Sequence, residues 1–347
     1  MNIGGREIGP GHPPYIIAEV SCNHGGMINR ALQLIQAAKD CGADAVKFQC
    51  VTANTITLDC DRPEFKIERG PWAGRNLYDL YQQTQTPFGW FKYIKKQADD
   101  IGMTWFASVF DKTAVDLMVQ LDAPAIKIAS FELVDIPLIQ YAAETGKPMI
   151  LSTGMASYDE IRAAVVASRK TDRALLHCVS GYPTPASEAN LTCIPALRSM
   201  FGIPVGISDH GGPEIPIAAT ALGACIIEKH FRLIPHPDTE DSPFSLDENQ
   251  FAAMVRSVRS TWDAIKPSLR KTEESSRPLR RSLFAVQDIK EGELFTEANV
   301  RSIRPGHGAA PAAIGQFIGK KAGRNIARGE PLAFNMIDKG EQWIIRL

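Results

Sequence analysis

The sequence has no long apolar run and no excess of charge of either sign. No stretch approaches the roughly 18 consecutive apolar residues of a membrane-spanning helix. The amino terminus, MNIGGREIGPGHPPYIIAEV, lacks a basic region followed by an apolar core. A net charge of −1 with mixed signs argues against nucleic acid or an anionic membrane as the main partner. We therefore expect a cytoplasmic protein that binds neither nucleic acid nor membrane.

Cysteine motifs and repeats are missing as well. The seven cysteines are odd in number, scattered and without CxxC spacing, which favours reduced thiols over a disulfide or zinc framework. Cys22 and Cys178 come near the ends of predicted strands, where they could line a site. No low-complexity tract or solenoid period is present.

Strand and helix patterns alternate along the first 265 residues. Short apolar runs predict strands over residues 15–20, 45–49, 104–108, 125–128, 149–152, 174–177, 205–208 and 225–229. Helical spacing of apolar residues predicts helices over 27–41, 90–101, 112–121, 137–145, 158–168, 194–201, 214–222 and 247–265. This alternation predicts a (β/α)8 TIM barrel over residues 1–265. The runner-up, a doubly wound sheet, would usually carry a GxGxxG loop, which is absent.

The chain changes character after residue 265. Residues 266–280 are polar and bounded by prolines, which is typical of a linker. Residues 281–347 show short strand patterns, repeated glycines and no long amphipathic helix. We expect a small, mostly β second domain there.

Two histidines follow neighbouring predicted strands. His210 and His230 come at the carboxyl ends of the seventh and eighth strands, and in a parallel α/β fold these ends open on one crevice. Two neutral imidazoles there could hold a divalent cation such as Mn²⁺ or Zn²⁺. The polar residues around them are Ser208, Asp209, Glu228 and Lys229. A lone histidine is more often an ordinary loop residue, but this pairing favours a metal site.

Other polar residues come at the same ends of the predicted strands. They are Glu19, Ser21, Asn23, His24, Lys47, Gln49, Ser108, Lys127, Ser130, Glu132, Ser152, Thr153, His177, Ser180, Tyr182 and Asp241. Lysines and hydroxyls at one barrel mouth donate hydrogen bonds to an anion and predict a phosphate cradle. The carboxylates would offset this positive charge and handle protons or sugar hydroxyls.

Segments of the chain resemble, in order and spacing, the signatures of the sialic acid synthase family. They are IIAEVSCNHGG (16–26), GADAVKFQ (42–49), IKIASFE (126–132), ILSTGM (150–155), LLHCVSGYPTP (175–185), GISDH (206–210) and EKHF (228–231). Residues 280–308 and 323–332 resemble the antifreeze-like SAF module of that family. The resemblance covers nearly the whole chain.

The resemblance implies a transferase that condenses phosphoenolpyruvate with an N-acetylated amino sugar, consumes water and releases phosphate. It implies that phosphoenolpyruvate is held by Lys47, Ser108, Lys127, Ser130, Ser152, Ser180 and Ser208. It implies that the sugar faces Gln49, Glu132, Tyr182, Asp241 and Arg304, the last from the SAF module of the partner in a domain-exchanged homodimer. The implied catalytic residues are Glu19, His210 and His230, with both histidines on a divalent metal ion, Mn²⁺ before Mg²⁺ or Co²⁺.

Three features bear on the identity of the sugar. The insertion at 63–90 and the segment TEDSPFSLD (239–247) resemble the pseudaminate branch of the family, and Ser180 stands where neuraminate enzymes commonly have asparagine. They imply 2,4-diacetamido-2,4,6-trideoxy-L-altropyranose as the substrate. An exposed Trp72 could pack on its less polar face or simply anchor the loop. The alternatives within the family are a neuraminate synthase acting on N-acetylmannosamine and a legionaminate synthase.

Two hypotheses from other classes stay open. A non-catalytic sugar-binding scaffold could keep the barrel and the second domain, but it would be free to lose both histidines and both lysines. A metal-dependent aldolase acting on pyruvate shares the barrel, but it would not need two lysines and so many hydroxyls. Phosphate release distinguishes both from a phosphoenolpyruvate-dependent synthase.

Overall fold

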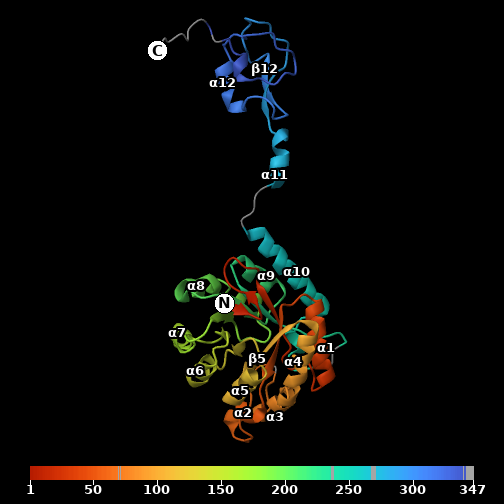
Figure 1. The fold of residues 1–347 in the computed structure, drawn as a ribbon, viewed down its shortest axis with the longest axis vertical. Helices are drawn as coiled ribbons and strands as arrows, with labels where there is room; N and C mark the ends of the chain where they lie inside the picture. Colours follow the sequence, from red (N-terminus) through yellow and green to blue (C-terminus); the bar gives the residue numbers. More distant parts are fainter. Residues whose placement is uncertain (69, 71, 236–237, 267–270, 339, 341–347) are drawn as a thin grey trace. The chain divides into compact units, whose positions relative to one another are not determined.

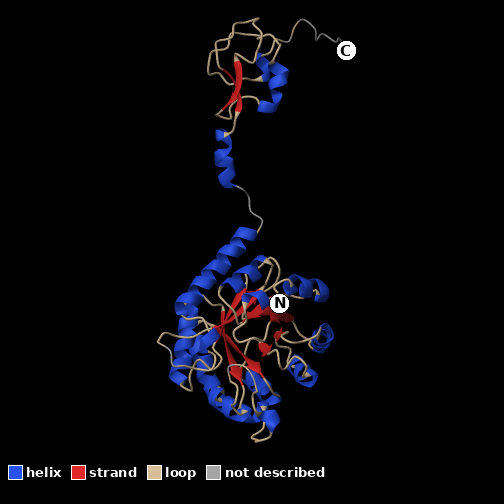
Figure 2. Cartoon of the chain, turned by 180° about the vertical axis from the view of Figure 1, so that it is seen from behind, coloured by secondary structure: helices blue, strands red, loops and turns tan. Residues whose placement is uncertain are grey.

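The computed structural model describes the chain except residues 69, 71, 236–237, 267–270, 339 and 341–347. It forms two compact units, Met1–Lys266 and Pro267–Leu347 (Figure 1). In the first unit, eight parallel strands form a closed barrel, and Figure 2 shows these strands inside a ring of helices. The (β/α)8 barrel predicted from the sequence is confirmed.

Each predicted strand and helix of the barrel appears within one residue of its expected bounds. The barrel strands are β3 (Tyr15–Glu19), β4 (Ala45–Cys50), β5 (Thr104–Val109), β6 (Ile126–Ile128), β7 (Met149–Ser152), β8 (Arg173–Cys178), β9 (Val205–Asp209) and β10 (Ile226–His230), which pairs with β3 to close the barrel. The main helices are α1 (Ile28–Asp40), α4 (Phe91–Ile101), α5 (Lys112–Gln120), α6 (Ile136–Glu144), α7 (Tyr158–Ala167), α8 (Cys193–Phe201), α9 (Glu214–Ala221) and α10 (Glu248–Ile265).

Local sequence signals explain where the helices begin and end. Asp247 caps α10 and accepts a hydrogen bond from the backbone nitrogen of Gln250, whose side chain bonds back to Asp247. Ser157 caps α7 in the same way. Gly102 and Gly202 end α4 and α8 with φ near 66°, a left-handed conformation that glycine adopts without steric cost.

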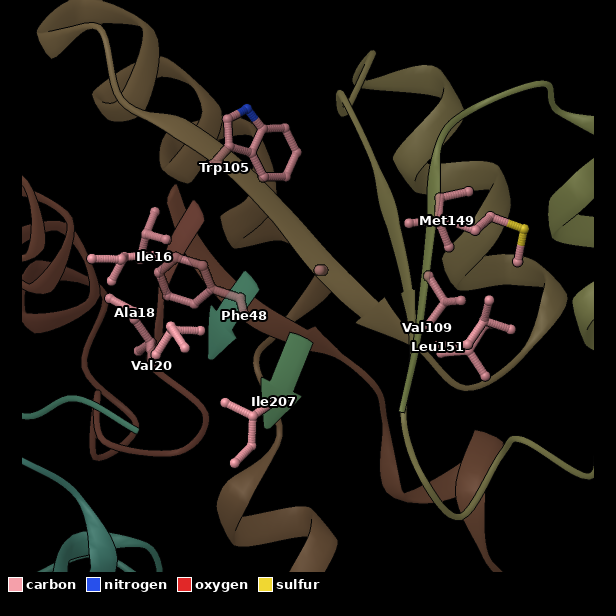
Figure 3. Packing of buried hydrophobic residues seen from close by; sticks show 14 of the residues in the cluster. Ile16, Ala18, Val20, Phe48, Trp105, Val109, Met149, Leu151 and Ile207 are labelled. Atoms are coloured by element: carbon pink, nitrogen blue, oxygen red, sulfur yellow. The ribbon is translucent and has the colours of Figure 1, made fainter. Parts of the chain in front are cut away.

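Alternation along the strands separates two apolar cores. Outward-facing strand residues pack against the helices, and Figure 3 shows several of them, Ile16, Ala18, Val20, Phe48, Trp105, Val109, Met149, Leu151 and Ile207. The inward-facing residues nearest the amino ends of the strands form the second cluster, which includes Tyr15, Ile17, Ala45, Phe106, Ile150, Leu176 and Ile226. The next inward position along each strand is polar, except on β8 where it is Cys178, so the barrel interior is apolar at one end and mostly polar at the other.

An amino-terminal hairpin closes the apolar end of the barrel. It consists of β1 (Asn2–Ile3) and β2 (Arg6–Glu7), which pair antiparallel. Ile3 and Ile8 are buried in the inner cluster, and the amino group of Met1 donates to the Ile8 carbonyl at 3.0 Å. This end of the barrel is therefore sealed by side chains.

The insertion between β4 and α4 is partly helical. It contains α2 (Ala53–Ile56), α3 (Leu77–Thr84) and two short 3-10 helices, and α3 lay outside the sequence-based prediction. His24 anchors the insertion, because its Nε2 lies 3.1 Å from Thr86 Oγ1 and its ring packs edge-on against Trp90. The predicted strand-end histidine thus has a structural role.

The second unit holds a two-stranded antiparallel sheet, β11 (Ser282–Ala285) and β12 (Val300–Ile303), extended by isolated bridges, together with α12 (Ile314–Phe317). Phe295 and Phe317 lie in its own apolar core. Part of the expected linker is helical, as α11 (Lys271–Ser276). No helix in the described part of the chain combines the length and apolar character needed to cross a bilayer.

Candidate active site

A cavity of about 710 Å³ opens at the carboxyl ends of the barrel strands. Alternate residues of each strand face inward, and every barrel strand except β8 contributes a polar side chain to the cavity, whereas β8 contributes Cys178. All the residues that the family resemblance assigns to the site line this cavity except Glu132 and Arg304, whereas Asn23, His24, Thr153 and His177 from the wider set of strand-end residues do not line it. The members of the predicted set that it brings together are Glu19, Lys47, Gln49, Ser108, Lys127, Ser130, Ser152, Ser180, Tyr182, Ser208, His210, His230 and Asp241.

Two buried lysines face the same carboxylate inside this cavity. Lys47 Nζ donates to Ser108 Oγ at 2.8 Å, and Lys127 Nζ donates to Ser152 Oγ at 2.6 Å. Both ammonium groups lie near Oε1 of Glu228, at 3.7 and 3.9 Å. The arrangement offers several charge-assisted donors to a small anion.

The two carboxylates beside the lysines have pKa values displaced in opposite directions. Burial raises the pKa of Glu19 to about 7, although Lys47, at 2.6 Å, opposes the shift. Burial alone would raise the pKa of Glu228, but Lys127 and Lys47 bring it below its ordinary value. Glu228 therefore stays ionised, while Glu19 exchanges a proton near neutral pH, as a general acid or base must.

The pKa values of the two lysines are also displaced in opposite directions. Burial lowers the pKa of Lys127, and Glu228 offsets this only in part. Burial acts on Lys47 in the same way, but Glu19 and Glu228 together raise its pKa above the ordinary value. Lys127 is thus the less well compensated cation.

His210 and His230 face each other with ring centroids 5.3 Å apart. His210 Nδ1 lies 3.1 Å from the Val179 carbonyl oxygen, which can only accept, so Nδ1 carries the proton and Nε2 keeps its lone pair. Burial lowers the pKa of His210 to about 4 and that of His230 well below its ordinary value. Both imidazoles are neutral at physiological pH, which is the form that ligates metals.

One wall of the cavity carries a hydrogen-bonded polar chain. Gln49 Nε2 donates to Ser21 Oγ at 2.9 Å and to Glu19 Oε1 at 3.2 Å, and Ser21 Oγ donates to Asp241. Burial raises the pKa of Asp241 to about 6, with Ser21 opposing the shift. These groups can bind hydroxyl and amide groups of a ligand.

Ser130 and Ser180 come close together over Gly154. The Gly154 backbone nitrogen donates to Ser130 Oγ at 3.1 Å. A Cβ at position 154 would lie 2.7 Å from Ser130 Oγ and 2.3 Å from Ser180 Oγ. Glycine is therefore required for both hydroxyls to occupy the cavity wall.

The insertion supplies an apolar wall, which consists of Ile67, Trp72, Leu77, Leu80 and Tyr81. Trp72 is half-buried, not exposed as expected, and its ring lies 5.9 Å from that of Tyr182. This apolar wall faces the same cavity as the polar chain. The cavity therefore has a polar side and an apolar side.

An ion pair joins the insertion to the segment after β10. Arg75 bonds to Glu240 and also donates to Gln83 Oε1 at 2.5 Å. Glu240 lies next to Asp241 on the cavity lining. The apolar wall is thus fastened to the segment that carries Asp241.

Some residues that were predicted for the site do not line the cavity. Glu132 is half-buried beside the cavity and does not line it. Arg304 is an exposed residue of the second unit. The expectation that Asp209 and Lys229 surround the metal site is wrong, because they sit on the outward strand face and bond to each other at 2.6 Å.

Three kinds of functional residue were missed or undervalued. Glu228 was noted near the histidines but not assigned to the site, although it shares an inward strand face with His230. Because side chains alternate between the two faces of a strand, the position of Glu228 two residues before His230 was a signal for its place in the site. Ser21 was named among the strand-end residues but given no role, and of the apolar wall only Trp72 was named. Cys22 and Cys178 do line the cavity, and all seven cysteines are free.

The fold and the site define a TIM-barrel protein whose strand-end cavity suits a small anion together with a polar organic ligand. The model of the NeuB family matches residues 34–269, and the model of the SAF domain matches residues 280–338. The chain belongs to the NeuB family and ends in a SAF domain. The family resemblance read from the strand-end motifs is confirmed.

Relatives match the chain over most of its length. A pseudaminic acid synthase from Campylobacter jejuni is 42% identical over 325 residues, which cover 92% of this chain and 95% of the relative. A pseudaminic acid synthase from Helicobacter pylori is 40% identical and covers 94% and 98%. The solved N-acetylneuraminic acid synthetase from Leptospira borgpetersenii, in complex with citrate, is 32% identical, with a TM-score of 0.69, and covers 80% and 95%.

Proposed function

We propose that this chain is a pseudaminic acid synthase, which condenses phosphoenolpyruvate with 2,4-diacetamido-2,4,6-trideoxy-L-altropyranose, consumes water and releases phosphate. The observation that carries this proposal is the pair of buried lysines, each bonded to a serine hydroxyl, in one cavity with two neutral imidazoles. The relatives that are about 40% identical over most of the chain and are named pseudaminic acid synthases support it.

Phosphoenolpyruvate carries a phosphate and a carboxylate, and the cavity offers donors for both. Lys47 with Ser108 and Lys127 with Ser152 form two cationic positions, and further serine hydroxyls complete them. In the reaction, C3 of the enol phosphate forms a bond to the aldehyde carbon of the open-chain sugar. Water then adds at C2, and the C2–O bond to phosphate breaks. The lysines stabilise the phosphate charge from start to finish.

Glu19 is the residue for proton transfer. The new alkoxide must gain a proton, and the attacking water must lose one. Burial raises the pKa of Glu19 to about 7, so the carboxyl can give or take a proton at physiological pH. Gln49 Nε2, which donates to Glu19 Oε1 at 3.2 Å, orients the group.

We propose that His210 and His230 hold a divalent metal ion, Mn²⁺ before Mg²⁺ or Co²⁺. The residues fit such an ion, because both rings are neutral and His230 Nδ1 is buried without a hydrogen-bond partner. No group of three or more His, Cys, Asp or Glu is arranged as a metal site among the described residues, so the two imidazoles would leave positions for water and sugar oxygens. A bound ion would polarise the sugar aldehyde and orient the attacking water.

The apolar wall supports a 6-deoxy sugar. A methyl group can be buried against Leu77, Leu80 and Tyr81, whereas the C6 hydroxyl of N-acetylmannosamine would lose a hydrogen bond to water there. The polar chain through Asp241 suits the acetamido and hydroxyl groups. The second candidate is a synthase of the neuraminate or legionaminate type, favoured by the solved relative that is 32% identical.

We further propose a domain-exchanged homodimer in which the SAF domain completes the site of the partner subunit. Arg304 is exposed and directly follows the end of β12, so its guanidinium is available to the acetamido end of a sugar in that site. A site closed by a second subunit would exclude bulk water from the reacting centre.

The test is phosphate release with Mn²⁺, phosphoenolpyruvate and either the diacetamido altrose or N-acetylmannosamine, followed by product mass. Turnover of the diacetamido sugar alone is the expected result. Turnover of N-acetylmannosamine alone would keep the chemistry and overturn the sugar. No phosphate release with either sugar would favour another sugar or the binding-scaffold hypothesis, and product formed from pyruvate supplied in place of phosphoenolpyruvate would indicate an aldolase. Chelation and His210→Ala should each abolish the metal-dependent rate.

A further inference from the structure

A buried ion pair lies just outside the cavity, between the two strands that carry the histidines. Lys229 of β10 is completely buried, and its Nζ lies 2.6 Å from Oδ2 of Asp209, the last residue of β9. Lys229 shares its strand face with Ile227 and Phe231, which belong to the core between strands and helices. A charge in this apolar row costs desolvation, and such pairs add little to stability. Its presence therefore calls for another explanation.

The ion pair encloses the turn that follows His210. Asp209 Oδ1 accepts a hydrogen bond from the Gly211 backbone nitrogen at 3.0 Å, and Lys229 Nζ donates to the Gly211 carbonyl oxygen. Both polar backbone atoms of Gly211 are thus held by one ion pair. The space around the turn is tight, since a Cβ at position 211 would lie 2.9 Å from the Thr184 carbonyl oxygen and 3.3 Å from Asp209 Oδ1.

His210 is held from the other side by the segment after β8. The Thr184 backbone nitrogen donates to the His210 carbonyl oxygen at 3.1 Å, and His210 Nδ1 donates to the Val179 carbonyl oxygen at 3.1 Å. The ring keeps its bond to Val179 only while the backbone of the turn stays in place. That backbone is what Asp209 and Lys229 hold.

We propose that Asp209 and Lys229 are positioning residues for His210. They hold the turn at 209–211, which keeps Nδ1 of His210 on the Val179 carbonyl and leaves Nε2 as the ligand atom for the divalent metal ion of the proposed function. Partners behind a metal-binding histidine commonly fix its tautomer and orientation. Here the partners act through the backbone, from the opposite side of the strand.

The test compares the full-length wild type with Asp209→Asn/Lys229→Met, which removes both charges at similar volume. Imidazole ¹⁵N NMR reports the tautomer of His210, assigned with His210→Ala, and electron paramagnetic resonance reports the Kd for Mn²⁺ alone. The matched control is Arg259→Met, which removes a partner of Asp44 at the other end of the barrel. Gly211→Ala displaces the same turn without changing a charge, and it replaces the double variant if that variant does not fold.

We expect the wild type and Arg259→Met to show the fixed Nδ1–H tautomer. The double variant and Gly211→Ala should show a mixture of tautomers, and their Kd for Mn²⁺ should rise by about 10- to 100-fold. Unchanged His210 resonances in a folded double variant would overturn the inference. If the wild type binds no more Mn²⁺ than His210→Ala, the metal of the proposed function fails, and the tautomer comparison alone decides the role of the ion pair.

Discussion

The cavity holds two buried lysines and two buried glutamates, but the lysines differ in how close the nearest carboxylate lies. Glu228 keeps its charge because two lysines lie within 4 Å, at 3.7 and 3.9 Å. Lys47 has a carboxylate of Glu19 at 2.6 Å, whereas the carboxylate nearest to Lys127 among its ion pairs is at 3.9 Å. Lys127 is therefore the cation with most to gain from an anionic ligand.

Lys127→Met should lower kcat/KM for phosphoenolpyruvate by at least about 100-fold, because a charge-assisted contact to the anion is lost. The fold should survive, since methionine fills a similar apolar volume. Steady-state kinetics with varied phosphoenolpyruvate measure the effect. Lys96→Met, on the exposed face of α4, is the control and should be neutral. An unchanged kcat/KM for phosphoenolpyruvate in the Lys127 variant would contradict the assignment.

The stability of the fold should depend on pH through the ionisation of Glu132. Burial raises its pKa to about 7, and its Oε2 has no hydrogen-bond partner. The folded state thus prefers the protonated form, so wild-type stability falls as pH rises from the ordinary pKa through about 7. Glu132→Gln should match the wild type below about pH 4.5 and be more stable above pH 7, by up to about 3 kcal/mol.

Denaturant unfolding at a low and a high pH measures this difference. The hydrogen bonds at Ser157 lower the pKa of Glu160, so Glu160→Gln is the opposite control and should become less stable relative to the wild type as the pH rises. A constant difference between Glu132→Gln and the wild type across the pH range would show that Glu132 does not titrate with folding.

Residue positions in the site were predictable where strand geometry controls them. Lys47, Ser108 and Ser208 follow from the inward alternation of strands that are themselves clear in the sequence. Glu132 lies in the turn after β6, where alternation no longer decides the direction of a side chain. Asp209 was misplaced for the opposite reason, because it still belongs to β9 and so faces outward.

At the scale of elements, the insertion was the part least accessible from sequence. The helix α3 lies in a segment whose position depends on distant contacts, such as His24 with Thr86 and Arg75 with Glu240. Local patterns do not report such contacts. The regular strands and helices carry their own period and caps, which is why their bounds were predicted closely.

Arg75→Ala should loosen the apolar wall over the cavity mouth. We expect the KM for the sugar to rise by about 5- to 10-fold, the loss of about 1 kcal/mol expected for a half-buried ion pair. The KM for phosphoenolpyruvate should not change, because its proposed contacts are to lysines and serines of the barrel and not to the insertion. Arg62→Ala removes an exposed ion pair of the same insertion and serves as the control. An equal rise for both substrates would argue against a wall that contacts the sugar alone.

At the scale of the whole molecule, domain exchange makes a prediction about mixed dimers. Arg304→Ala would remove the proposed contact of the SAF domain, and Lys127→Met would disable the barrel site, so each variant alone should have little activity. Co-expression of the two should restore about a quarter of wild-type activity, because half the dimers are mixed and each has one intact site. Activity of purified mixed dimers no higher than the sum of the two variants would place Arg304 and the barrel site in the same chain.

The amino-terminal hairpin bears on the order in which substrates bind and products leave. Ile3 and Ile8 seal one end of the barrel, so substrates can enter the described cavity only from the end where the insertion lies. The lysines are deep and the apolar wall is at the rim, so a sugar bound at the rim blocks the path below it. The kinetics should therefore follow a compulsory order, with phosphoenolpyruvate first and the sugar second. Phosphate should then leave last, after the product of the proposed condensation has left the rim.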